Sequence, residues 1–289
     1  MNRFSFRLAA SLVLLASAAV SNAATVGSVA DSRFSTSWTL DGSEQANTRA
    51  KLLNTANFGA GGTVTEGITI VDTAATITTG LLSGFDVFYI GYLNDGNANA
   101  FSAAELTAMS DYVTGGGVMV VTCDDGSHDA VCASFGFPAT TSATPPVAPT
   151  VAGAAHPVFS GPFGTVTSIN MSGTVGLFST AAGATVLGED SAGSPNPIVL
   201  EYTLGAGTVI LFSDVDIIAN AASAGSTISS QNDQFLGNLF AYAIGAGGAP
   251  GPAPSATPIP TIPAYGLLLT MVGLVLVAGR RIRQSLTRQ

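Results

Sequence analysis

The side chains best suited to chemistry in this chain are carboxylates that follow apolar segments. Asp124 and Asp125 come directly after one such segment, Asp214 follows a second, and Asp95 lies in the loop after a third. Because the carboxyl ends of parallel strands meet at one edge of a sheet, we expect these side chains to gather there. The acidic residues that this placement brings to the edge are Asp95, Asp124, Asp125, Asp129, Asp214 and Asp216.

Three interpretations of this acidic set stay open. Clustered carboxylate oxygens bind Ca²⁺, and a carboxylate pair can act as acid and base where the pKa of one member is raised. The third interpretation is a solvated group of acidic loops without a ligand. We therefore take Asp95, Asp124, Asp125 and Asp214 as the candidate ligand or cation site, with Ca²⁺ as the only cofactor that it suggests.

Cys123 is a candidate nucleophile because it ends the apolar segment before Asp124. A cysteine nucleophile needs a base, usually histidine, but the histidines of the chain are His128 and His156, and none follows Asp214. Two adjacent carboxylates would also raise the pKa of the thiol. Cys123 and Cys132 stand nine positions apart, which in an oxidising compartment favours a disulfide. We predict that disulfide and no catalytic residue.

Two weaker hypotheses concern the histidines. A zinc site of Cys123, His128 and Cys132 would lack a ligand and has no zinc-type spacing. His156 precedes Pro157, and a local structural partner explains it more simply than a ligand role.

The elements that would position these residues follow from apolar runs. Residues 85–93, 118–122 and 208–212 are nearly unbroken apolar runs, typical of strands buried on both faces of a parallel sheet. Between the first two, Ser102 and Glu105 form a capping box that predicts a helix to about residue 113. Strand, helix and strand at this spacing predict a βαβ unit.

The rest of the body gives weaker signals. We expect a helix opened by Asp41 and Glu44, with Ala46, Ala50 and Leu53 on its inner face. Further predictions are strands at 25–30, 63–71, 164–169, 176–179, 184–187 and 198–202, a short helix at 129–135, a loop at 140–151 and a last helix at 234–244. This order predicts one three-layer α/β domain over residues 24–247, followed by a Gly, Pro and Ala linker over 248–258.

Charge excludes one class of partner. Residues 24–258 hold three basic and eighteen acidic residues, a net charge of −15, whereas the whole chain carries −9. Nucleic-acid binding requires cations that displace counterions from phosphates, so no nucleic acid is expected. A divalent cation suits such a surface.

Both ends of the chain carry signals for export. Arg3 and Arg7, an apolar stretch over 8–20 and Ser21-Asn22-Ala23 form a secretory signal at 1–23 that signal peptidase would cleave, although an uncleaved anchor is the alternative. Near the C-terminus, residues 265–279 are uncharged and can span a membrane with help from the preceding residues, and a basic end follows. A plain tail anchor is the simpler interpretation.

The C-terminal pattern resembles a known sorting signal. Residues 259–289 are similar to the IPTL-CTERM signal, a relative of PEP-CTERM signals, with Ile262 and Tyr265 standing where that family has Leu and Trp. The residues that carry the resemblance are Ile259, Pro260, Thr261, Ile262, Tyr265, Gly266, Arg280 and Arg281. It implies processing by an exosortase-type membrane protease of a Gram-negative bacterium, after transient anchoring in the inner membrane.

The body resembles the class I glutamine amidotransferase-like, flavodoxin-like superfamily, near ThuA-like proteins. The residues that carry this resemblance are FDVFYIGY from 85, YVTGGGVMVV from 112, HPVF from 156, LEYTLGAGTVILFSD from 200 and NDQFLGNLFAYA from 232. The family's Cys-His-Glu triad has no counterpart here. We therefore expect an exported surface or extracellular module that binds a ligand or builds structure, with a secreted hydrolase that uses the acidic edge as the alternative.

Overall fold

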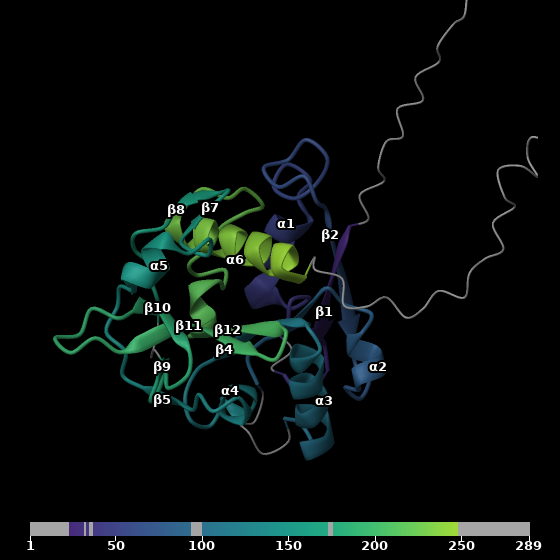
Figure 1. The fold of residues 1–289 in the computed structure, drawn as a ribbon. Helices are drawn as coiled ribbons and strands as arrows, with labels where there is room; N and C mark the ends of the chain where they lie inside the picture. Colours follow the sequence, from purple (N-terminus) through teal and green to yellow (C-terminus); the bar gives the residue numbers. More distant parts are fainter. Residues whose placement is uncertain (1–22, 32, 35–36, 94–99, 173–175, 248–289) are drawn as a thin grey trace, which may run out of the picture. The chain divides into compact units, whose positions relative to one another are not determined.

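The computed structural model describes residues 23–31, 33–34, 37–93, 100–172 and 176–247. Its centre is an eight-stranded sheet in the order β2-β1-β3-β4-β12-β11-β10-β6 (Figure 1). Five neighbours run parallel: β2 (Ile68–Thr73), β1 (Ala24–Val29), β3 (Val87–Ile90), β4 (Val118–Cys123) and β12 (Gly207–Ser213). The other strands are antiparallel to their neighbours: β11 (Pro197–Leu204), β10 (Thr185–Glu189) and β6 (Ala148–Pro149).

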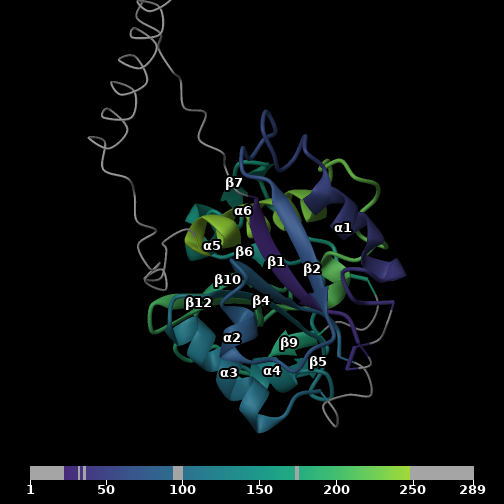
Figure 2. The ribbon, with the colours of Figure 1, turned by 90° about the vertical axis from the view of Figure 1, so that its right-hand side faces the viewer.

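Helices cover both faces of this sheet (Figure 1, Figure 2). On one face lie α1 (Ala46–Leu53) and α6 (Gln231–Gly247), and on the other α2 (Thr79–Leu82), α3 (Ala103–Thr114) and α4 (Ala130–Ser134). An apolar core lies on each face of the sheet, and strand β4 contributes side chains to both. Val118 and Val120 pack toward α6, while Met119 and Val121 pack toward α3. All six residues of β4 are buried, as its unbroken apolar run predicts.

Smaller elements fill the periphery. Helix α5 (Val151–Ala155) precedes a short ribbon of β7 (Ser160–Gly161) and β8 (Gly164–Thr165). Strand β5 (Ala139–Thr141) pairs with β9 (Gly176–Phe178), and the 3₁₀ turns η1 (Ser43–Gln45) and η2 (Val215–Ile217) lie before α1 and after β12.

The prediction of a three-layer α/β fold with a large, mostly parallel sheet is confirmed. The capping box is present as well: Ser102 accepts a hydrogen bond from the Glu105 backbone, and the Glu105 side chain accepts one from the Ser102 backbone. The predicted loop at 140–151 was wrong, because it contains β6 and pairs through Val147 with Ile169.

The prediction for α1 was wrong in its inner face. Leu53 is 44% exposed, whereas Thr48, Lys51 and Leu52 are fully buried. Asp41 does not cap the element either; Gly42 precedes η1 without a side-chain cap. Lys51 can be buried because its ammonium donates to the carbonyls of Ala224 and Gly225 and pairs with Asp233. Those partners are remote in sequence.

Residues 1–22 of the predicted signal peptide, the linker over 248–258 and the sorting motif lie outside the described residues, as does the apolar stretch 265–279. Among the residues that are described, none of the helices combines the length and apolar character that crossing a membrane requires.

Candidate functional site

The candidate site lies at the carboxyl ends of three adjacent parallel strands. Asp124 directly follows β4, Asp214 directly follows β12, and Tyr92 lies two residues after β3. The register places Cys123 opposite Ser213, so the two aspartates leave the sheet side by side. A cavity of about 160 Å³ opens here, lined by Trp38, Tyr92, Asp124, Asp214, Val215 and Asp216.

Asp124 and Asp214 form a hydrogen-bonded carboxyl pair. Asp214 is 2% exposed, and its burial, together with the charge of Asp124, raises its pKa to about 8. Burial and the neighbouring Asp125 raise the pKa of Asp124 to about 6. Their mutual hydrogen bond lowers the pKa of Asp124 and raises that of Asp214. Asp214 has the higher pKa of the two, so it is the carboxyl group that more readily keeps a proton near neutral pH, where it can donate to Asp124.

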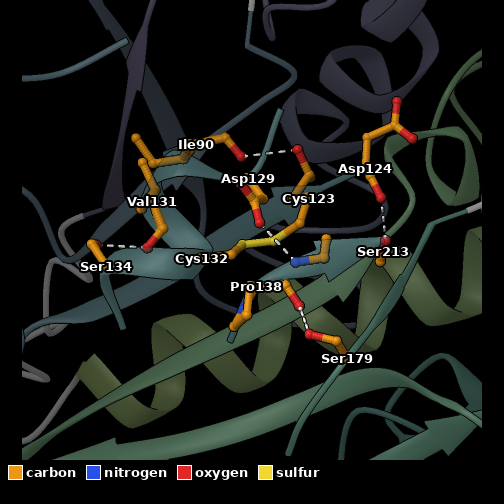
Figure 3. Close-up of a disulfide and its surroundings, with 12 residues drawn as sticks. Ile90, Cys123, Asp124, Asp129, Val131, Cys132, Ser134, Pro138, Ser179 and Ser213 are labelled. Atoms are coloured by element: carbon orange, nitrogen blue, oxygen red, sulfur yellow. Dashed lines mark hydrogen bonds between the residues drawn. A yellow bond between two sulfur atoms is a disulfide. The ribbon is translucent and has the colours of Figure 1, made fainter. Parts of the chain in front are cut away.

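The backbone fixes both members of the pair. The Asp214 carboxylate caps η2 by accepting a hydrogen bond from the backbone N–H of Asp216 at 2.8 Å. The hydroxyl of Ser213 donates to the carbonyl of Asp124 at 3.2 Å (Figure 3). Gly176 of β9 packs so closely that a Cβ there would collide with this same carbonyl oxygen. The pair is thus held by strands on either side.

Asp216 extends the acidic character of the cavity. Burial is the largest cause that raises the pKa of Asp216, and the charge of Glu44 raises it further. A hydrogen bond with Ser172 lowers this pKa in part. The sequence pattern grouped Asp216 with the other carboxylates, and the structure brings it to the same cavity.

Aromatic rings form the other side of the cavity. The rings of Trp38 and Tyr92 lie 5.9 Å apart between centroids, and the imidazole of His128 stacks on Tyr92 at 4.6 Å. Burial, followed by the charges of the surrounding aspartates, raises the pKa of Tyr92 to about 12, so its hydroxyl keeps its proton at neutral pH. This combination of rings and carboxylates can hold a cation or a sugar-like ring.

Other predicted site residues take different places. Asp125 accepts hydrogen bonds from the backbone and hydroxyl of Ser127 and contacts His128 at 3.0 Å. Although burial raises the pKa of Asp125, these bonds lower it below its usual value. The buried Asp129 accepts a hydrogen bond from the backbone of Ala139 and supports β5. Asp95 lies outside the described residues.

The disulfide between Cys123 and Cys132 is confirmed (Figure 3). Its Cα atoms lie 6.4 Å apart, and both residues are buried. The hypotheses of a cysteine nucleophile and of a zinc thiolate at these positions are therefore wrong, because both sulfurs are bonded to each other. The bridge ties α4 to the end of β4 and closes the loop that carries Asp124, Asp125 and His128.

His156 belongs to a separate group of side chains that does not line this cavity. His156 contacts Glu201 at 3.3 Å, and the hydroxyl of Tyr242 donates to the same carboxylate. His156 thus has structural partners, and these two are remote in sequence. In the described part of the chain, no three His, Cys, Asp or Glu side chains gather closely enough to hold a metal ion.

The sequence did not indicate the aromatic wall. Tyr92 belongs to an apolar run that is typical of a buried strand, and Trp38 lies in an irregular segment before η1. The predicted strand covers 85–93, and only the structure shows that β3 ends at Ile90, which leaves Tyr92 beyond the strand.

Comparisons with known proteins give only distant similarities. No protein-family model matches the chain, and neither does any curated protein. Among solved structures, a putative ThuA-like protein from Bacteroides uniformis is 15% identical, with 76% of this chain and 90% of that one covered at a TM-score of 0.46. A putative ThuA-like protein from Parabacteroides merdae is 10% identical, with 78% and 91% covered at 0.46. A β-galactosidase from Bacillus circulans sp. alkalophilus is 14% identical, with 76% and 30% covered at 0.46.

Proposed function

We propose that this chain is an exported cell-envelope protein whose α/β domain is a non-catalytic binding module for a ligand that carries a protonated amine. The observation that carries the proposal is the Asp124–Asp214 pair in a cavity that Trp38 and Tyr92 also line. The pair retains one negative charge at neutral pH. The cavity is small, so it takes a head group or a single ring.

The balance of charges around the cavity favours a cation. Arg33 pairs with Asp31 and Glu105, Arg49 pairs with Asp72, and Lys51 pairs with Asp233. These are the basic residues of the described domain, and none of them lines the cavity. The carboxylates there raise one another's pKa values, which a positive ligand would relieve. An aromatic face adds about 0.5–2 kcal/mol to the binding of a cation.

The test compares amines with matched neutral molecules. The full-length protein is titrated calorimetrically with ethanolamine and glucosamine, and with ethylene glycol and N-acetylglucosamine as neutral counterparts. Ligands of this size bind with Kd values on the order of 1 mM at best, so high concentrations are used. We expect only the amines to bind, and binding to weaken below about pH 6 as Asp124 takes up a proton.

Adjacent aspartates supply a matched pair of variants. Asp124→Asn removes the charge in the cavity and should weaken amine binding at least about tenfold, which is about 1.4 kcal/mol. Asp125→Asn changes a carboxylate that is bonded within its own turn and does not line the cavity, so it should weaken amine binding much less than Asp124→Asn does, although its charge acts on Asp124. Equal affinity for amines and their neutral counterparts would refute the proposal. Ca²⁺ in the same titration tests the other cation that the charge suggests.

The body is, on this proposal, a glutamine amidotransferase-like domain without its catalytic residues. Cys123, the candidate for that family's cysteine nucleophile, is the last residue of β4 and is bonded to Cys132. Thiol labelling of the native protein should therefore detect no free cysteine.

One observation favours a second function, a hydrolase at the same site. The pKa values of Asp124 and Asp214 are raised to about 6 and about 8, which suits a base and an acid near neutral pH. Turnover of 4-nitrophenyl glycosides or esters that disappears in Asp124→Asn, with the fold retained, would establish this function instead.

The export proposal rests on the two ends of the chain. A disulfide also fits an oxidising compartment outside the cytoplasm. Signal peptidase would cut after Ala23, and an exosortase-type protease would act at the motif around residue 259. The intact mass of the protein recovered from cell fractions tests both cuts, and full-length material in the cytosol would refute them.

A further inference from the structure

A second cavity lies close to the acidic one and differs from it in chemistry. It has a volume of about 330 Å³ and lies at the start of α6. Hydroxyl and amide side chains dominate its lining: Ser168, Asn170, Ser172, Ser230, Gln231 and Asn232. Two alanines and Met171 complete the lining, and none of the lining residues is charged.

Buried hydrogen bonds fix the walls of this second cavity. The Asn232 side chain is 3% exposed; it accepts a hydrogen bond from the backbone of Asn170 and donates to the carbonyls of Asn170 and Ile217, both at 2.8 Å. Gln231 accepts a hydrogen bond from the backbone of Thr167 at 2.6 Å. These bonds hold the segment before β9 against α6, so the cavity is formed before any ligand binds.

A hydrogen bond joins the two cavities. Ser172 lines the second cavity and bonds to Asp216, which lines the acidic one. Ala221 and Ala222, on the other side of the second cavity, follow η2, and η2 begins directly after Asp214. The two cavities are therefore neighbours, and the Ser172–Asp216 hydrogen bond lies in the wall between them.

We infer that the ligand of this domain is an oligosaccharide that carries an amine, with the amine in the acidic cavity and a neighbouring sugar unit in the second cavity. This inference rests on the proposed function. Sugar hydroxyls both donate and accept hydrogen bonds, which the half-buried Ser168 and the exposed Asn170 in the lining can match. The amides of Gln231 and Asn232 shape the cavity through their bonds within the protein. A peptide would call for apolar side-chain pockets or charges, and Met171 is the only large apolar residue in the lining.

Chain length is the variable that tests the inference. The full-length protein is titrated with glucosamine and with its β-1,4-linked dimer and trimer. We expect the dimer to bind at least about tenfold more tightly than the monomer, because the second unit reaches a preformed site. A lysine-containing tripeptide serves as the competing ligand class.

A blocking variant separates the two cavities. Ala221 is exposed and lines the second cavity but not the acidic one, so we expect Ala221→Tyr to occupy that space and leave the acid pair unchanged. The variant should bind the dimer no more tightly than the monomer, while its affinity for the monomer and its melting temperature stay unchanged. Asn170→Ala removes an exposed amide from the wall and should reduce the gain from chain length in the same direction.

The outcomes distinguish this inference from the proposed function. If glucosamine binds but the dimer gains nothing, or if Ala221→Tyr leaves the gain intact, the second-cavity assignment is wrong and the amine site stands. A larger gain for the tripeptide than for the sugar trimer would also overturn the assignment. If neither ethanolamine nor glucosamine binds, the proposed function itself fails.

Discussion

Asp214→Asn offers the sharpest test of how the acidic cavity is built. The Asp214 carboxyl group is buried, caps η2 at the backbone of Asp216 and bonds to Asp124. Asparagine keeps an oxygen for the cap and an N–H donor for Asp124 but cannot ionise. The substitution therefore removes a buried titratable group and retains the shape and the hydrogen bonds of the site.

The sign of the effect follows from the pKa of Asp214. Burial and Asp124 raise it from 3.8 to about 8. Below about pH 4 both folded and unfolded forms hold the proton, so the group has no effect on stability. As pH rises, the unfolded chain loses this proton first, and the free energy of unfolding falls until the folded group also ionises near pH 8.

The magnitude follows from the same shift. At about 1.4 kcal/mol for each pKa unit, the cost of Asp214 at pH 7 is on the order of 4 kcal/mol. Asp124 shares the proton and stays in the cavity, so we expect Asp214→Asn to raise the free energy of unfolding by about 2 kcal/mol at neutral pH. For a domain of this size that raises the melting temperature by about 4–8 °C. Near pH 4 the variant and the wild type should be nearly equal.

Urea unfolding of the full-length protein between about pH 4 and pH 8 measures this difference. Asp125→Asn is the control, because hydrogen bonds lower the pKa of Asp125 and its charge stabilises the fold above its ordinary pKa. That control should lose stability at the higher pH, opposite to Asp214→Asn. If Asp214→Asn is destabilised equally at both pH values, the electrostatic account of the pair is refuted.

Two further predictions concern the supports of the domain. Replacing both Cys123 and Cys132 by alanine should lower the free energy of unfolding by about 2–3 kcal/mol, measured by urea unfolding, because the bridge closes a ten-residue loop; no loss would mean that the bridge does not restrict the unfolded chain. Lys51→Met should cost about 3–5 kcal/mol because the buried Asp233 carboxylate loses its cation and keeps only its hydrogen bonds to serines. Arg49→Met on the more exposed pair should cost less than about 1 kcal/mol, and equal losses would contradict the difference in burial between the two pairs.

The central sheet could be predicted because its signal is local. The runs that became β3, β4 and β12 are long, apolar and bounded by turns, and a strand buried on both faces needs nothing else. The capping box before α3 is likewise contained in four consecutive residues. Elements with these properties are specified by their own segment, whatever the rest of the chain does.

The buried face of helix α1 could not be predicted from the sequence, for the opposite reason. Its buried face contains Thr48 and Lys51, whose hydrogen bonds go to the carbonyls of Ile218, Ala224 and Gly225. A lysine on an inner face contradicts any pattern based on hydrophobicity. Only the loop after η2, about 170 residues further along the chain, makes that burial favourable.

In the candidate site, too, some residues could be predicted from the sequence and others could not. Asp124 and Asp214 could be predicted because position alone, directly after a buried strand, places a side chain at the carboxyl edge. Position could not separate Asp124 from Asp125, since the turn after β4 decides which carboxylate enters the cavity. Tertiary structure alone places Trp38 in the lining of the cavity. The segment before η1 has no regular pattern from which the direction of this side chain could be predicted.

The shared proton also predicts how binding is coupled to pH. A positive group beside the pair stabilises the doubly ionised form and therefore lowers the pKa of Asp214 from about 8. Amine binding at pH 7 must then release part of a proton from the pair, because the ammonium group of the ligand takes over the positive charge that this proton supplied. Calorimetric titration of glucosamine in two buffers of different ionisation enthalpy measures this release. We expect more proton release from the wild type than from Asp214→Asn, because only the wild type can lose the Asp214 proton, whereas the amine and Asp124 exchange protons in both proteins. Equal proton release in the two proteins would show that Asp214 does not respond to the ligand.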